Sequence, residues 1–457
     1  MAAALLCAAC SPQAGSQFGV PSTTMSRQFQ RSGRGEFTEK ILYSFPLNPK
    51  RKNPIFPSSG LFASSGDFYG ATSDTAGFRG GTGAIFELTD KLKLEAVARF
   101  RVKAGGTYPS GLAGDESGSL YGTTRQGGDA ACLPRLGCGT VFKLSQSGSS
   151  YARSTLYSFT GGSDGIGPSG SLLAGANHDL YGTTVAGGVT NCGSLGCGTV
   201  FRLRPVRGHY RERILYRFRG GLDGSEPVGG VTEDSNGTLY GVTASGGNCA
   251  DSSFGCGTVY ELTPRGRTYD ERVLYRFAGT ANQDGAFPAS PPVLSSDGTL
   301  YGTTRGGGER GCQQGCGTVF RLVPSRESYK ESVLAYFAPA PHKVGRQPSG
   351  LFLSNGELYG TTELGGRQTD YYFPDGFGTA FKVNAFSGKV TILHDFSGPP
   401  DGADPTGGLS VGPDGSLYGA TSRGGTGQCV FHTGCGTIYR LSAPRAAGPG
   451  AVQAEPH

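Results

Sequence analysis

The sequence contains no tryptophan and no uninterrupted apolar stretch of the length that a membrane-spanning helix needs. The second absence excludes a membrane-spanning helix. The first weakens the hypotheses of a sugar platform or a quinone site, because such sites generally use large aromatic faces. The six histidines lie at unrelated places in the chain and lack the spacing of metal ligands. The chain therefore shows few of the patterns that identify an enzyme.

The net charge is also small. The 457 residues include 41 basic and 35 acidic side chains, mixed along the chain, with a formal charge of +6. This balance is too mild to indicate a nucleic-acid partner. The densest basic stretch, residues 202–220, is either an anion-binding patch or an exposed outer strand whose charges prevent edge-to-edge pairing. We favour the outer strand.

Glycine and aromatic residues are abundant instead. The sequence has 80 glycines and 27 prolines, together with 21 tyrosines and 26 phenylalanines. The glycine and proline content approaches that of low-complexity chains, but the aromatic content is too high for a disordered polymer. A repetitive β protein with many turns fits both observations.

A repeat of about 60 residues runs through the chain. Its clearest marker is Tyr-Gly, which is followed each time by a glycine-rich loop and a segment of the type GTVF. Repeats of this length indicate solenoids or propellers, in which each repeat is one structural unit. Seven copies occur in register, and their marker tyrosines are Tyr69, Tyr121, Tyr181, Tyr240, Tyr301, Tyr359 and Tyr418.

Each unit contains four short runs of strand character. In one unit these are residues 168–175, 180–185, 197–204 and 210–218. Within the third run, Phe201 and Leu203 share one face and Val200 points to the other, so both faces of the sheet carry apolar groups. Such a sheet must be covered on both sides.

Seven four-stranded units with two-sided burial predict an all-β, seven-bladed β-propeller over residues 36–442. The ends of the repeat region support this fold. Residues 35–45 match the fourth strand of the other units, whereas the last unit stops after its third strand at 436–441. We therefore expect the N-terminal strand to complete the C-terminal blade. A solenoid is the alternative, but it would need polar terminal caps that neither end offers.

The regions outside the propeller have different compositions. Residues 1–10 resemble the end of an export signal, and Cys10 stands where a bacterial lipoprotein would carry its lipid. Residues 11–35 are rich in serine, glycine and glutamine and are expected to form a flexible linker. Residues 443–457 are expected to be a disordered tail.

The order of motifs within each unit resembles a known family. Tyr-Ser-Phe is followed by Asp-Gly-x-x-Pro, Leu-Tyr-Gly-Thr-Thr, Gly-Gly and Gly-Cys-Gly-Thr-Val-Phe-Lys-Leu. This pattern resembles the GloVer tandem repeat of bacterial surface and exported proteins, over about residues 36–442. The resemblance implies an exported and often surface-anchored protein, and it implies no established activity or active site.

Ten of the 12 cysteines lie in the loop between the second and third strands of a unit, and they occur in pairs. The two units that lack one member of the pair also lack the other. Zinc is the alternative to a disulfide, but each loop has only two thiols and no regularly placed histidine. We therefore predict five disulfides, which form in oxidising compartments. The pairs are Cys132 with Cys138, Cys192 with Cys197, Cys249 with Cys256, Cys312 with Cys316, and Cys429 with Cys435.

The long, variable connections predict where a ligand would bind. In a propeller, the loops between the second and third strands lie on the same rim as the connections from one blade to the next, and long loops on a rigid scaffold usually carry binding sites. Two sets of side chains on this rim are ligand-binding candidates. The first is Asp164, Asp223, Asp284 and Asp401, which either hold calcium or, as we favour, cap turn amides. The second is Arg125, Arg305 and Arg423, which either gather an anionic ligand or, as we favour, are solvated surface residues.

These observations predict an exported, disulfide-bonded repeat propeller that acts as a non-catalytic binding or scaffold module. Its expected partner is an extracellular or envelope ligand, namely a glycan, a peptide or a protein. We expect no nucleic-acid partner, no cofactor, contact with a membrane only through a lipid anchor, and a monomeric state. The alternative is a propeller hydrolase or lyase that uses the looped rim around the channel mouth.

Overall fold

The structure is a computed structural model that describes residues 37–46, 54–75, 83–101 and 106–444, with short gaps in the last range. These gaps are residues 116, 130–131, 134–135, 149, 248, 250–251, 309–311, 313, 327, 339–343, 367–374 and 430–432. The predicted export signal with Cys10, the predicted linker and nearly all of the predicted tail lie outside the described residues and stay predictions.

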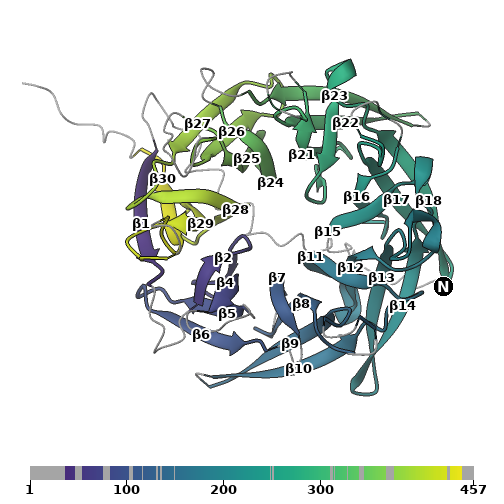
Figure 1. The fold of residues 1–457 in the computed structure, drawn as a ribbon, viewed down its shortest axis with the longest axis horizontal. Helices are drawn as coiled ribbons and strands as arrows, with labels where there is room; N and C mark the ends of the chain where they lie inside the picture. The colour runs from purple at the N-terminus through teal and green to yellow at the C-terminus, as the bar shows by residue number, and fades with distance from the viewer. Residues whose placement is uncertain are drawn as a thin grey trace, which may run out of the picture.

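The described strands form seven separate sheets that stand as blades around a central channel (Figure 1). This arrangement confirms the predicted seven-bladed propeller. Within each blade the strands are antiparallel, with the first strand nearest the channel and the fourth at the periphery. In two blades the first strand is divided into two short strands that pair with the same second strand. No helix among the described residues is long and apolar enough to cross a membrane.

The blades are numbered along the chain. Blade 1 contains β2 (Pro54–Pro57), β3 (Phe62–Ser64), β4 (Asp67–Thr75), β5 (Ala84–Leu88) and β6 (Leu94–Arg99). Blade 2 contains β7 (Thr107–Gly114), β8 (Leu120–Gln126), β9 (Thr140–Ser147) and β10 (Ser150–Ser158). Blade 3 contains β11 (Ile166–Ala174), β12 (Leu180–Ala186), β13 (Thr199–Val206) and β14 (His209–Arg217). Blade 4 contains β15 (Ser225–Glu233), β16 (Leu239–Ser245), β17 (Thr258–Arg265) and β18 (Thr268–Arg276).

The remaining blades follow the same plan. Blade 5 contains β19 (Gly285–Pro288), β20 (Val293–Leu294), β21 (Leu300–Gly307), β22 (Thr318–Ser325) and β23 (Ser328–Tyr336). Blade 6 contains β24 (Arg346–Ser354), β25 (Glu357–Leu364), β26 (Thr379–Asn384) and β27 (Val390–Asp395). Blade 7 contains β28 (Gly402–Val411), β29 (Leu417–Gly424), β30 (Thr437–Ser442) and β1 (Thr38–Ser44). In the part of the chain that the structure describes, short 3-10 helices lie in connections: η2 (Ala176–His178), η3 (Thr190–Cys192), η4 (Gly221–Asp223) and η5 (Thr280–Asn282).

The chain closes the ring with its two ends. β1, the first described strand, pairs antiparallel with β30, the last, so that Thr38 lies opposite Ser442 and Glu39 opposite Leu441. The N-terminal strand thus completes the C-terminal blade, as the sequence predicts.

Aromatic side chains join each blade to the next. A phenylalanine just after the fourth strand of one blade packs at an angle against an aromatic ring in the third strand of the following blade. The ring centroids lie 4.9 to 5.4 Å apart. Angled aromatic pairs of this kind add to the stabilisation from burial alone. The pairs are Phe45–Phe86, Phe100–Phe142, Phe159–Phe201, Phe218–Tyr260, Phe277–Phe320, Phe337–Phe381 and Phe396–Tyr439.

The glycine of each Tyr-Gly marker makes room for this packing. A Cβ atom on Gly182 would lie 2.6 Å from Cζ of Phe201 and 2.9 Å from Cδ2 of Leu172, which is too close for carbon atoms. The same clash would occur at Gly122 against Phe142. Tyr-Gly therefore recurs because the second strand must leave space for the aromatic ring of the third.

Candidate functional site

The two rims of the propeller differ in their connections. The loop rim carries the connections between second and third strands and those between blades. The turn rim carries the hairpin turns that join the first strand to the second and the third strand to the fourth. On the loop rim the two kinds of connection touch: a Cβ on Gly161, between blades 2 and 3, would lie 2.5 Å from Sγ of Cys132. The long connections thus share one rim, as expected.

All five predicted disulfides are present, which confirms the pairing derived from the sequence. Their Cα atoms lie 5.1 to 5.8 Å apart. The cysteine nearer the third strand is fully buried in each case. Each bond therefore joins a loop to the start of a buried strand. We call these five disulfides the staples.

The backbone carbonyl of this buried cysteine forms a hydrogen bond with the next blade. In four of the five stapled units it accepts a hydrogen bond, 2.8 to 2.9 Å long, from the backbone N–H of a residue just before a proline in the following blade. The fifth staple does the same across the ring closure, where Phe56 donates to Cys435 at 2.9 Å. Phe377 in blade 6, which stands at the position of this cysteine, accepts the same bond from the N–H of Asp404 at 3.0 Å. The backbone contact therefore belongs to the repeat, and in five units a disulfide restrains the residue that accepts it.

The residue before this proline has an unusual backbone conformation in all seven blades. Its φ is positive, between 52° and 65°, although a proline follows and would favour an extended conformation. Six of the seven residues are not glycine, and a left-handed conformation strains such residues. We call this set the mouth ring, and it comprises Phe56, Tyr108, Gly167, Glu226, Phe287, Gln347 and Asp404.

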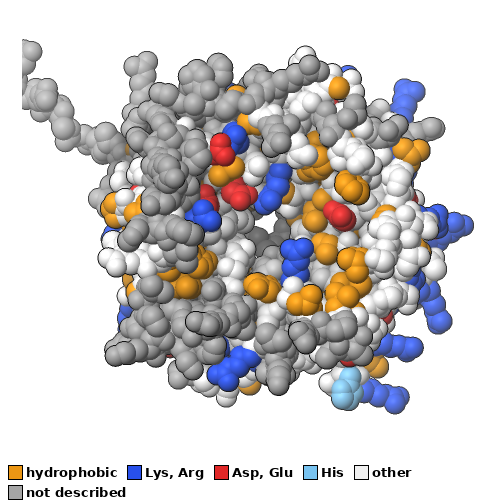
Figure 2. Space-filling model, in the orientation of Figure 1, with side chains coloured by type: hydrophobic (Ala, Val, Ile, Leu, Met, Phe, Trp, Pro, Cys, Tyr) orange, Lys and Arg blue, Asp and Glu red, His pale blue; other side chains and the backbone are white. Residues whose placement is uncertain are grey.

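The mouth ring surrounds the loop-rim end of the channel. Its members stand at the starts of the first strands, which lie nearest the channel (Figure 1). Figure 2 shows a hollow at the centre of one face with charged side chains of both signs gathered around it. Tyr108 is 41% exposed and Glu226 is also exposed. Side chains of very different chemistry therefore occupy equivalent backbone positions around one opening.

The three predicted arginines lie beside the mouth ring, at or near the ends of second strands. Arg305 forms an ion pair with Glu363 at 3.4 Å, and Arg423 with Asp404 at 3.4 Å. The Cγ atom of Arg125 would lie 3.8 Å from a Cβ on Gly167. Burial raises the pKa of Asp404 to about 6, against the opposing effect of Arg423. The arginines are thus at the channel mouth, and their role in binding a ligand stays a prediction.

The four predicted aspartates bind the backbone of their own connections. The carboxylate of Asp164 accepts hydrogen bonds from the N–H and hydroxyl of Thr160, at 2.8 and 2.9 Å. Asp223 accepts the N–H of Arg219 at 2.6 Å, Asp284 the N–H of Ala278 at 2.7 Å, and Asp401 the N–H of Ser397 at 3.0 Å. These contacts are those of capped turns. Calcium binding at these residues stays a prediction.

Each of these aspartates also belongs to a cluster that sequence reasoning missed. At the boundary between blades 3 and 4, the hydroxyl of Tyr216 donates to Asp223 at 2.7 Å and to Glu271 at 3.3 Å. Burial, and then the nearby carboxylate of Asp223, raise the pKa of Glu271 to about 7. We call this arrangement a boundary cluster. Four boundaries have one: Tyr157–Asp164–Glu212, Tyr216–Asp223–Glu271, Tyr275–Asp284–Glu331 and His394–Asp401–Glu39.

The aspartate and the glutamate of a boundary cluster are either both present at a boundary or both absent. At the other three boundaries the position of the glutamate, opposite the last apolar residue of the third strand, holds Leu94, Arg153 or Val390. The connections at those boundaries also lack the Asp-Gly pair. This co-occurrence is the pattern from which the clusters could have been predicted.

One boundary cluster has the side chains to hold a metal ion. Ligand atoms of Glu39, His394 and Asp401 lie within 4.8 Å of one another, and Nε2 of His394 is 3.1 Å from Oδ2 of Asp401. One histidine and two carboxylates are ligands that a divalent cation such as zinc accepts. The histidine spacing did not reveal this group, because its members come from opposite ends of the chain.

Comparison with solved structures finds propellers of low identity. A putative oxidoreductase (glucose dehydrogenase) from Thermus thermophilus is 19% identical, with 74% of this chain and 98% of that chain covered and a TM-score of 0.43. A putative 6-phosphogluconolactonase from Bacteroides uniformis is 14% identical, with 79% and 89% covered and a TM-score of 0.47. A puromycin hydrolase mutant is 13% identical, with 80% and 50% covered and a TM-score of 0.49. These similarities carry no activity over to this chain.

Comparison with curated proteins finds no match. Comparison with family sequence patterns gives a match along almost all of the described propeller. The Gloeobacter/Verrucomicrobia repeat matches residues 56–312, 190–370 and 309–448. Together these segments span all seven marker tyrosines and all five disulfides. The chain therefore belongs to the Gloeobacter/Verrucomicrobia repeat family.

Proposed function

We propose that this chain is a non-catalytic binding module and that its ligand enters the channel mouth at the loop rim. One observation carries the proposal: the mouth ring repeats in backbone conformation but not in side chain. All seven equivalent positions are left-handed and six of them hold strained, non-glycine residues, and such strain is concentrated where a protein has a functional constraint. Variable side chains on a constant backbone give one opening an asymmetric surface that can distinguish ligands.

The chemistry of the mouth supports binding better than catalysis. Tyr108 offers an exposed aromatic ring, and Phe56 and Phe287 expose part of rings that also pack against the blade cores. Glu226 and the Arg423–Asp404 pair offer charges of both signs. The aspartates that would serve a hydrolase or lyase instead accept hydrogen bonds inside their own turns. The hydrolase or lyase remains the alternative to be tested.

We also propose that the protein works outside the cytoplasm. Five disulfides join cysteines that are close in sequence, and such bonds persist in oxidising compartments. An export signal and a lipid at Cys10 would deliver and anchor it there.

An array of peptides and glycans probed with the purified full chain tests the proposed function. We expect selective binding of one ligand class, with dissociation constants in the micromolar range or below. The bound ligands are then incubated with the protein and analysed by mass spectrometry. Unmodified ligand supports the binding module, cleaved ligand establishes the hydrolase or lyase, and no binding above background overturns the proposal.

A further inference from the structure

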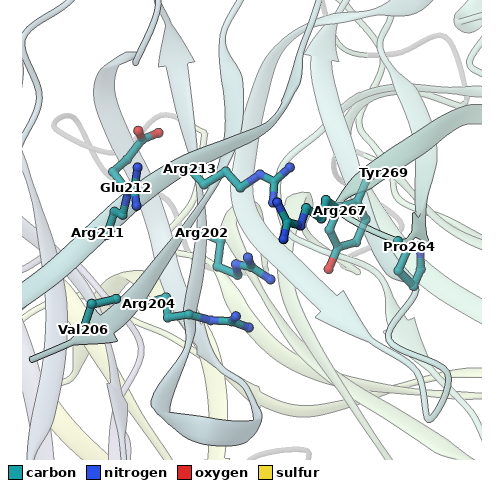
Figure 3. Close-up of a pocket in the computed structure, with 10 residues that line it drawn as sticks. Arg202, Arg204, Val206, Arg211, Glu212, Arg213, Pro264, Arg267 and Tyr269 are labelled. Carbon is teal, nitrogen blue, oxygen red and sulfur yellow. The ribbon is translucent and has the colours of Figure 1, made fainter.

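A groove of about 820 Å³ lies between the outer parts of blades 3 and 4 (Figure 3). Strands β13 and β14 form one side of the groove, and the hairpin of β17 and β18 forms the other. It is distinct from the channel mouth, since its residues come from third and fourth strands and their turns. Its lining is unusually basic and includes Arg202, Arg204, Arg211, Arg213 and Arg267.

Four of these arginines face each other across one strand pair. Arg202 lies opposite Arg213, and Arg204 lies opposite Arg211, in the antiparallel register of β13 and β14. Residues that lie opposite in this way share a face, and like charges in such pairs destabilise a sheet. Blade 3 therefore keeps an arrangement that works against its own folding.

Equivalent positions in other blades show that the propeller fold does not require this arrangement. In blade 4 the pair is Glu261 and Arg272, which form an ion pair at 2.8 Å. In blade 5 it is Arg321 and Ser332, with a hydrogen bond at 3.4 Å. The like-charged pairs of blade 3 are thus a feature of this groove and not of the repeat.

The groove contains too little negative charge to neutralise its arginines. Asp179, whose side chain is 3% exposed, accepts three hydrogen bonds of 2.8 to 3.2 Å from Arg204. One of its carboxylate oxygens lies 3.8 Å from Nε of Arg202. Glu212 points away from the guanidinium groups of Arg202, Arg204, Arg213 and Arg267 (Figure 3). It faces Asp164 in the boundary cluster on the other side of the sheet.

Arg213 and Arg267 project into the groove (Figure 3). Among the described residues, no carboxylate forms an ion pair with Arg211, Arg213 or Arg267. Figure 3 shows the guanidinium groups of Arg213 and Arg267 directed toward each other from opposite sides of the groove, with Tyr269 beside them. Two guanidinium groups brought together without an anion repel each other, and an anion between them would remove the repulsion.

We propose that this groove binds an acidic polysaccharide, whose anionic groups pair with Arg211, Arg213 and Arg267. Residues two apart on a strand stand about 7 Å apart, so a ligand that meets several arginines needs anionic groups spaced along a chain. The fork of a guanidinium matches a carboxylate or sulfate in two parallel hydrogen bonds. Tyr269 offers a partly buried ring edge to the sugar, while charge supplies most of the affinity.

Calorimetric titration of the full chain with defined oligosaccharides tests this assignment. The probes are oligogalacturonate for carboxylates, heparin oligosaccharide for sulfates, and a neutral oligosaccharide of equal length. We expect one or both acidic probes to bind at least about tenfold more tightly than the neutral one, and less tightly as salt rises. Equal affinity for the neutral probe would overturn the proposal. Tighter binding of single-stranded DNA than of either acidic probe would also overturn it, in favour of nucleic acid.

Paired variants locate the site. R213S with R267S removes two cations from the groove, and serine is the residue of blade 5 at the position of Arg213. R326S with R99S removes two exposed cations elsewhere and leaves the same net charge. We expect about a tenfold or greater loss of affinity from the groove pair and less than about a twofold loss from the control pair. Equal losses would show that only the overall charge matters and would refute the groove. The control pair should retain the melting temperature of the parent chain, and the groove pair should match or exceed it, because R213S removes one of two opposed like charges. Both pairs should keep the binding at the channel mouth, so that failure here is distinct from failure of the proposed function.

Discussion

The blade cores repeat the same residues and contacts from blade to blade, whereas the mouth ring repeats only a backbone conformation. In the cores, the residue and its contact both recur: a glycine in the second strand, an aromatic ring in the third and a phenylalanine from the preceding blade. In the mouth ring only the backbone recurs, with φ between 52° and 65°, while the side chain changes from phenylalanine to glutamate to glycine. Repetition of a residue marks the scaffold, and repetition of a conformation without the residue marks the candidate ligand site.

The largest expected effect comes from the core. Gly182→Ala places a Cβ 2.6 Å from Cζ of Phe201, and the buried ring cannot move without disturbing its contact with Phe159 of the preceding blade. We expect the free energy of unfolding to fall by about 3 kcal/mol, as overpacked cores show. Guanidinium unfolding measures this loss. G148N, at a hairpin turn where a Cβ meets nothing within 4 Å, is the control. Equal stability of both variants would contradict the packing account.

The staples should matter next, and mainly for the loop rim. In C249S with C256S, the loop of seven residues loses its crosslink, and the free energy of unfolding should fall by about 2 kcal/mol in the chain-entropy model. Hydrogen exchange should quicken at Phe287, whose N–H bonds to the carbonyl of Cys256, while the amides of β17 stay protected. Unchanged exchange at Phe287 would show that the staple does not hold the mouth ring.

The boundary clusters should give a smaller effect that depends on pH. The folded pKa of Glu271 is raised from 4.5 to about 7, by burial and then by Asp223. The folded state therefore holds a proton that the unfolded state loses, and this stabilisation disappears as pH rises from about 4.5 through 7. E271Q should match the parent melting temperature at pH 5 and exceed it by about 1–2 °C at pH 8.5. The exposed carboxylate variant E95Q serves as control, and a similar rise there would argue against the cluster.

The smallest effect on stability is expected at the mouth ring. Tyr108→Gly copies the residue that blade 3 has at Gly167, which adopts the same conformation without strain. Relief of strain and the greater entropy of unfolded glycine oppose each other, so stability should change by less than about 1 kcal/mol. Thermal unfolding measures the difference. A large loss would mean that the tyrosine side chain supports the scaffold.

Most of the fold could be predicted from the sequence because its causes are local and repeated. Tyr-Gly, the paired cysteines and the unmatched strand at each end together specify seven blades, the staples and the ring closure. The sequence also indicates that three arginines follow the Tyr-Gly strand, and their role as ligand-binding residues stays a prediction. The ion pairs of two of these arginines do not follow from the repeat pattern. Arg305 reaches Glu363 in the second strand of the next blade, and Arg423 reaches Asp404 in the first strand of its own blade.

The rest depends on conformation and on contacts between distant segments. A residue before proline normally adopts an extended backbone, so nothing in Asp-Gly-x-x-Pro suggested the left-handed mouth ring. The boundary clusters join an aspartate to a glutamate of the following blade, and one of them joins Asp401 to Glu39. The arginines of residues 202–220 were interpreted as an ordinary outer strand, and only the register revealed that they oppose each other.

The most direct test of the central claim is the affinity of Y108G with E226G for the ligand class identified by the array. Both positions then carry glycine, as blade 3 does at Gly167. The double variant removes one exposed hydrogen bond, which the hydroxyl of Ser245 donates to Glu226 at 3.0 Å. F386A, at an aromatic residue that is 80% exposed in the turn between β26 and β27, is the matched control. We predict at least about a tenfold loss of affinity for the double variant, with an unchanged melting temperature and full affinity in F386A. Parent-like affinity in the double variant would contradict a ligand site at the channel mouth.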